Sequence, residues 1–117
     1  MKQTAIWLDH QKAYIFDYQK DGIHERIVES HHNGRMTKEH LRKFYHDVAQ
    51  SLHGSQAILL MGPGQAKEEF KNHCEDHHHE VNSAIVKVEN MKDHPSVEQI
   101  LKTSNKFFKE QNTWQGI

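Results

Sequence analysis

The hydrophobic positions in the first part of the chain fall into three short runs separated by turn residues. Thr4–Leu8 (TAIWL), Ala13–Tyr18 (AYIFDY) and Ile23–Glu29 (IHERIVE) have the length and apolar content of β-strands. Asp9–Lys12 and Gln19–Gly22 lie between them and have the composition of tight turns. The third run has no clean apolar face, which is typical of an edge strand. The pattern therefore predicts an antiparallel meander.

After a polar loop, Ser30–Met36, the apolar spacing changes to that of a helix. A helix is predicted over Thr37–Leu52 because one face carries a regular apolar stripe. This stripe consists of Leu41, Phe44, Tyr45, Val48, Ala49 and Leu52. Thr37 stands at the N-cap position, with His40 where a capping box prefers Glu or Gln. Gly54 is expected to end the helix.

Two further strand–helix units follow. Ala57–Met61 (AILLM) and Ala84–Val88 (AIVKV) are apolar runs, and we interpret both as strands buried on both faces, as in parallel pairings covered by helices. Gly62-Pro63-Gly64 leads from the first of them into a helix over Gln65–Asp76. The inner face of that helix is expected to carry Ala66, Phe70 and Cys74.

A last helix is predicted to begin near Ser96, where Ser96 and Gln99 have the spacing of a capping box. Its inner stripe is Val97, Ile100, Leu101, Ser104, Phe107 and Phe108. The order β-β-β-α-β-α-β-α predicts one α/β domain over residues 1–117, with a core of about 4–108 and a tail, 109–117, in which Trp114 folds back. This is the order of a ribonuclease H-like arrangement, a mixed five-stranded sheet covered by helices, with the two later strands parallel to the first.

Composition narrows the function classes only slightly. The chain has 15 basic and 16 acidic residues and a net charge of −1, so any nucleic-acid surface must be a local basic patch. The single cysteine excludes an internal disulfide, and the apolar run near the N-terminus is too short for a signal peptide or a membrane span. We therefore expect a cytoplasmic protein without a membrane partner.

Histidine is the unusual component, with 12 residues. Protonation of all of them would move the net charge from −1 to +11, so affinity for a polyanion would depend strongly on pH. The alternative is that the histidines are ordinary surface composition.

Three segments resemble the middle domain of the archaeal and eukaryotic release factor and Pelota family. They are AIWLDHQKAYIF (5–16), ILLMGPGQAKEEF (58–70) and VENMKDHPSVEQIL (88–101), and the resemblance spans about Thr4 to Phe108. Short bacterial proteins described as translational machinery or host-attachment proteins carry similar segments. The resemblance implies the ribonuclease H-like fold and a partner such as the ribosome, rRNA or tRNA.

The same family places the Gly-Gly-Gln tripeptide that hydrolyses peptidyl-tRNA between the third strand and the first helix. The corresponding segment here, SHHNGRMTKEH (30–40), has one glycine, Gly34, followed by Arg35 and Met36. Gln65 of the Gly62-Pro63-Gly64-Gln65 stretch lies one helix later in the chain. The departure predicts a protein that is not an enzyme.

The candidate nucleic-acid residues are Arg35, Lys38, Arg42 and Lys43. Arg35, Lys38 and Arg42 are spaced to share one helix side, which lies beside nucleic acid in the family that the chain resembles. Glu39 and Asp47 dilute this charge, and a solvated helix face is the alternative.

Two other groups are candidate binding sites. Gly62, Gly64 and Lys67 at a helix N-terminus are a candidate anion site, although neither a Walker loop nor a dinucleotide fingerprint is complete; the alternative is a plain strand-to-helix turn. In HCEDHHHE (73–80), His73 and His77 are spaced to chelate zinc, nickel or copper together, with His78 and His79 adjacent; the alternative is adventitious binding.

Catalytic interpretations have little support. A ribonuclease H-type nuclease needs carboxylates from several elements, and Asp9 has no acidic partner in Ala57–Met61. Cys74 lies on an apolar helix side, which predicts a buried, inert thiol. No cofactor is expected. The leading hypothesis is a non-enzymatic translation-associated protein, and the alternative is a histidine-rich metal-binding or protein-interaction module.

Overall fold

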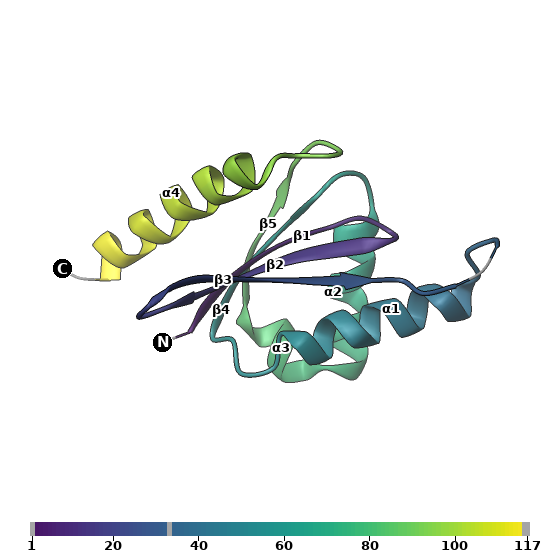
Figure 1. Cartoon of the computed structure of the whole chain (residues 1–117). Helices are drawn as coiled ribbons and strands as arrows, with labels where there is room; N and C mark the ends of the chain where they lie inside the picture. Colours follow the sequence, from purple (N-terminus) through teal and green to yellow (C-terminus); the bar gives the residue numbers. More distant parts are fainter. Residues whose placement is uncertain (1, 33, 116–117) are drawn as a thin grey trace.

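The computed structural model describes residues 2–32 and 34–115, with side chains as far as residue 111 (Figure 1). The five strands of this region form one mixed sheet in the order β3-β2-β1-β4-β5. The strands are β1 (Gln3–Leu8), β2 (Lys12–Gln19), β3 (Gly22–Glu29), β4 (Ala57–Gly62) and β5 (Ile85–Asn90). β1, β2 and β3 pair antiparallel, whereas β4 is parallel to β1 and β5 is parallel to β4. The predicted meander and parallel pairings are confirmed.

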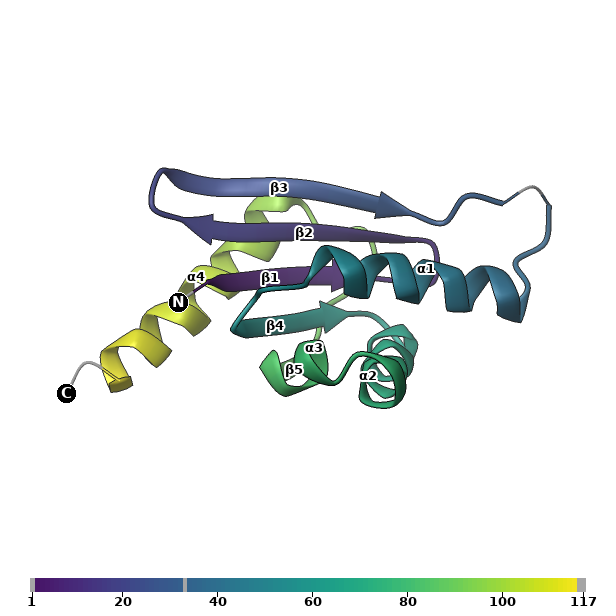
Figure 2. The same ribbon diagram turned by 90° about the horizontal axis from the view of Figure 1, so that it is seen from below.

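Helices cover both faces of this sheet. They are α1 (Lys38–Ser51), α2 (Ala66–His77), α3 (His79–Ala84) and α4 (Val97–Gln115). α1, α2 and α3 lie on one face and α4 on the other (Figures 1 and 2). The predicted α/β class, a mixed five-stranded sheet flanked by helices and consistent with a ribonuclease H-like fold, is confirmed, with the short α3 as an added element. No helix in the described part of the chain is long and apolar enough to cross a membrane.

The two faces of the sheet bury separate apolar clusters. Ile6 and Leu8 of β1 pack with Leu60 of β4 under α1 and α2. Ala5 and Trp7 of β1 pack on the opposite side with Leu59 of β4, beneath α4. Every residue of β4 is buried, so this strand forms the centre of both clusters. The continuous apolar run of β4 is thus explained by burial on both faces, as the sequence predicts.

The predicted stripe of α1 faces the sheet, and a capping box fixes the start of the helix. Thr37 Oγ1 accepts the backbone N–H of His40 at 3.1 Å, and His40 Nδ1 accepts the backbone N–H of Thr37 at 3.2 Å. A histidine thus occupies the position that glutamate or glutamine usually takes. An equivalent box joins Ser96 and Gln99 at the start of α4, as the sequence predicts.

Two sequence predictions about the second half are wrong in detail. β5 is not buried on both faces; it forms an edge of the sheet, and Val86 is 44% exposed. The segment after α2 contains the short helix α3, which the sequence does not predict. Val97, the first residue of α4, is 42% exposed and so is not part of the buried stripe.

The expected tail is also shorter. α4 continues to Gln115, so residues 109–115 are helical, and the side chain of Trp114 and residues 116–117 lie outside what the structure describes. The remaining stripe residues do face the sheet, with Ile100, Ser104 and Phe108 buried. Tyr18 of β2 anchors this helix, since its hydroxyl hydrogen-bonds Ser104 and Asn105. Burial raises the pKa of Tyr18, and the Ser104 bond partly offsets the rise.

The end of β4 approaches β1 so closely that only glycine fits there. A Cβ atom on Gly62 would lie 2.2 Å from the backbone oxygen of Leu8. Gly64, two residues on, has a positive φ of 56° but open space around it. Glycine is therefore favoured at the two positions for different reasons. At Gly62 the backbones approach closely, and at Gly64 the backbone is left-handed.

We expect Gly62→Ala to lower the free energy of unfolding by about 3 kcal/mol or more, because two backbones would have to separate. Gly64→Ala should cost only about 1 kcal/mol, the cost of a left-handed residue with a side chain. Urea denaturation of both variants measures the difference. Equal losses for the two variants would contradict a specific contact between Gly62 and Leu8.

Candidate functional site

The loop between β3 and α1 is held against the start of the helix. The backbone N–H of Ser30 donates to the carbonyl oxygen of Gln11 at 2.8 Å, and Ser30 Oγ lies 3.2 Å from His32 Nδ1. The ring of His32 stacks on that of His40, with centroids 4.9 Å apart. His40 thus joins the loop to the capping box. Two histidines of this segment have structural contacts that sequence analysis did not anticipate.

The four candidate nucleic-acid residues are all exposed on this loop and on α1. Lys38 is the first residue of α1, and Arg42 lies one turn later on the same side. Arg35 precedes the helix, so it does not share the helix side as predicted. Lys43 Nζ lies 3.6 Å from Asp47 Oδ2, which partly neutralises its charge. Within the described residues, no ion pair engages Arg35, Lys38 or Arg42.

A pocket of about 210 Å³ opens between the loop and α1. His31, Glu39, His40, Lys43 and Asp47 contribute to its lining. Because its charges are mixed, the pocket itself does not favour an anion. The less neutralised positive charge belongs to Arg35, Lys38 and Arg42, which do not line it.

The candidate anion site at the start of α2 has a different arrangement from the one expected. Lys67 is buried, and its ammonium group donates to the carbonyl oxygen of Gly64 at 2.6 Å. Glu68 also lies 3.6 Å from the Lys67 ammonium. The charge that was expected to hold an anion is thus engaged within the turn. These contacts favour the alternative interpretation, a strand-to-helix turn in which Gly62 allows close packing.

The candidate metal ligands are divided differently from the sequence prediction. One ligand atom each from His46, His73 and His78 lies within 4.8 Å of the others. His46 belongs to α1 and was missed, because the sequence does not show which face of α1 packs beside α2. His77 lies next to this group, with its ring centroid 5.0 Å from that of His73, but is not part of it.

The environment of the group favours neutral imidazoles. Burial lowers the pKa of His73, and the neighbouring His77, His78, His46 and Arg42 add to the effect. Burial also lowers the pKa of His78, together with His46, His77 and His53. A neutral imidazole carries the lone pair that a metal ion requires.

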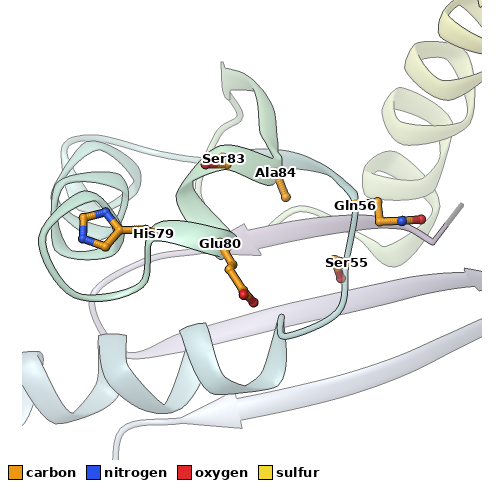
Figure 3. A pocket seen from close by; sticks show the side chains of 6 residues that line it. All are labelled: Ser55, Gln56, His79, Glu80, Ser83 and Ala84. Atoms are coloured by element: carbon orange, nitrogen blue, oxygen red, sulfur yellow. The ribbon is translucent and has the colours of Figure 1, made fainter.

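His79 lies instead at a pocket of about 430 Å³, whose lining Figure 3 shows. The pocket is lined by Ser55, Gln56, His79, Glu80, Ser83 and Ala84. The buried hydroxyl of Ser55 is hydrogen-bonded to Thr4 at 2.7 Å, so it is not paired with His79 as a nucleophile would be with its base. Glu80 Oε2 lies 3.8 Å from His53 Nδ1.

The two side chains considered for catalysis, Asp9 and Cys74, are each part of the packing or hydrogen bonding of the fold. Asp9 Oδ1 accepts the backbone N–H groups of Gln11 and Lys12 at 2.8 and 2.9 Å, and so closes the turn between β1 and β2. Cys74 is buried in the cluster beneath α2, as the apolar spacing predicts. Burial raises the pKa of its thiol to about 12, against a small opposing effect of Lys71.

Comparison with solved structures finds the same fold in Pelota and in an archaeal translation termination factor. Pelota from Archaeoglobus fulgidus matches 90% of this chain with a TM-score of 0.66 at 15% identity, and Pelota from Thermoplasma acidophilum matches 86% with a TM-score of 0.63 at 19% identity. The archaeal translation termination factor aRF1 matches 98% with a TM-score of 0.60 at 14% identity.

These matches extend over only part of the larger proteins. The chain spans 31% and 30% of the two Pelota chains and 41% of aRF1. No family model matches the sequence, and no curated protein matches it. The chain therefore resembles a domain of Pelota and of release factors in fold, as its sequence motifs predict.

We expect the Cys74 thiol to resist alkylation in the native protein. With a pKa of about 12, roughly one thiol in 10⁴ is ionised at pH 8, and burial blocks access to it. Labelling with iodoacetamide at pH 8, followed by mass spectrometry, should show modification only after urea unfolding. Cys74→Ser is the unlabelled control. Rapid labelling of the folded protein would contradict this burial.

Proposed function

We propose that the protein is a non-enzymatic component associated with the translation machinery. The observation that carries the proposal is the fold, which the chain shares with Pelota and aRF1 over 86–98% of its length. The neighbouring parts of those larger proteins are not matched, so the proposal concerns binding rather than their complete activities. The ribosome, rRNA or tRNA is the partner, and the cytoplasm is the corresponding location.

The loop Ser30–Met36 and α1 supply the contact surface in this proposal. Arg35, Lys38 and Arg42 project from a segment that Ser30, His32 and His40 hold in place. Basic side chains on a fixed segment neutralise phosphates without first ordering the chain. Lys43 contributes less, because Asp47 lies beside it. Because the net charge of the chain is −1, the attraction to RNA in this proposal comes from this local basic face and not from the charge of the whole molecule.

The sequence of the loop Ser30–Met36 is the reason that the proposed function is non-enzymatic. Gly34 is its one glycine, and no Gly-Gly-Gln occurs in the chain. The acid and the thiol considered for another chemistry have structural contacts, because Asp9 accepts backbone N–H groups and Cys74 is buried. Binding through phosphate contacts is the chemistry that remains for these side chains.

We expect the protein to co-sediment with ribosomes at low salt. Four phosphate contacts give a slope of about −3 in a plot of log affinity against log salt concentration. The triple variant Arg35→Ala/Lys38→Ala/Arg42→Ala should bind roughly tenfold or more weakly, with a slope of about −1. Quantitative pelleting over a series of KCl concentrations measures both, and filter binding with purified tRNA separates rRNA from tRNA as the ligand.

A matched control is available on α4, on the opposite face of the sheet. Lys102, Lys106 and Lys109 are exposed there, so Lys102→Ala/Lys106→Ala/Lys109→Ala removes the same charge. This variant should bind as the unmodified protein does. Equal losses in the two triple variants would show that binding is non-specific charge attraction. Absence of ribosome and tRNA binding at low salt would remove the proposal.

A separate assay tests the non-enzymatic part. Incubation of the protein with ribosome-bound peptidyl-tRNA should release no peptide above background, because the loop lacks the glycines and glutamine of the hydrolytic tripeptide. An authentic release factor serves as the positive control. Peptide release that a single substitution in residues 30–40 abolished would overturn this part while leaving the binding proposal intact.

A further inference from the structure

We propose that His46, His73 and His78 form a three-histidine site for a divalent transition-metal ion of the zinc class. Three parts of the chain bring the side chains together, namely α1, α2 and the residue that caps the C-terminus of α2. The ring centroids of His46 and His78 lie 5.2 Å apart, and those of His73 and His78 lie 5.4 Å apart. The proposal stands independently of any role in translation.

The buried nitrogens of the group have no protein partner. Nε2 of His73 and Nε2 of His78 are both shielded from solvent and form no hydrogen bond within the described residues. Buried polar atoms are nearly always paired, because an unpaired one costs free energy. Both nitrogens belong to rings that each offer a ligand atom within 4.8 Å of the others in the group, so they indicate a missing common partner. A metal ion satisfies both lone pairs at once, whereas a hydrogen-bond donor from the protein would reach only one.

The separations are close to those that a metal ion needs. Zinc binds imidazole nitrogen at about 2.0–2.1 Å, so two ligands at a tetrahedral angle are about 3.4 Å apart. The three atoms lie within 4.8 Å of one another, so side-chain rotations that move them by about 1 Å close the group. His46 is exposed and can supply most of that movement. Three protein ligands leave one tetrahedral position for water or for a further ligand.

The chemistry of the ligands selects the class of ion. Three neutral imidazoles suit zinc, copper and nickel, whereas magnesium and calcium prefer oxygen ligands. His77, His53 and Arg42 face the group as well, and the fixed positive charge of Arg42 opposes a cation there. The three imidazole bonds have to outweigh that repulsion.

Isothermal titration of the tag-free protein with Zn²⁺ at pH 7.5 tests the site. We expect one ion per chain, and a thermal melting temperature that rises when Zn²⁺ is added. His46→Ala should weaken binding roughly tenfold or more and remove the thermal shift. Because His46 is exposed, this variant should fold normally, and circular dichroism checks that it does. His78→Gln provides a second variant that keeps a polar side chain of similar size.

His79→Ala is the matched control, since His79 adjoins the group in sequence but lies at another pocket. It should bind Zn²⁺ with unchanged affinity. His77→Ala separates this site from the pair His73 and His77 that sequence spacing favours, and it should weaken binding far less than His46→Ala. Weak binding of several ions per chain, or equal losses in the His46 and His79 variants, would overturn the proposal. Mg²⁺ in place of Zn²⁺ should give no thermal shift.

Discussion

The parallel pairing of β1 with β4 is the contact on which the rest of the molecule depends. Both strands are apolar on both faces, so the sheet is stable in water only if helices cover it on each side. α1 covers one face and connects the edge strand β3 to β4, and α4 covers the other face. The same requirement places the outward side of α1 in solvent. The position of Lys38 and Arg42 is thus a consequence of how β1 and β4 are buried.

The histidines are explained by several local contacts rather than by one function. His40 and His32 hold the loop before α1, and His24 lies 2.8 Å from Asp21 beside the β2–β3 turn. His10 lies 3.1 Å from Glu69, which also accepts the Tyr45 hydroxyl at 2.9 Å, so one carboxylate joins the β1–β2 turn, α1 and α2. These rings have partners within the protein. His46, His73 and His78 differ because two of their nitrogens are buried without one in the described chain.

The sequence was sufficient for most of the fold, because local periodicity reflects burial directly. The stripes of α1 and α2, the capping box of Ser96 and Gln99, and the parallel β4 could all be predicted from residue spacing. β5 was misjudged because an apolar run of five residues looks the same at an edge as in the centre, and only strand order distinguishes them. The prediction of the histidine group was incomplete for a related reason. Spacing pairs His73 with His77 along one helix, whereas His46 comes from α1, and sequence holds no record of the packing between helices.

The two proposals meet at α1, where one side chain belongs to both. Arg42 is an exposed cation of the proposed RNA surface, and its charge also lowers the pKa of His73. A metal ion held by the histidines would strengthen the positive potential around Arg42, and a phosphate on Arg42 would offset the repulsion that the guanidinium exerts on the metal. By thermodynamic reciprocity, each ligand would then raise the affinity for the other by the same factor. If both proposals hold, metal and RNA would be cooperative rather than competing partners of α1, because the metal is repelled by the charge of Arg42 and the phosphate is attracted to it.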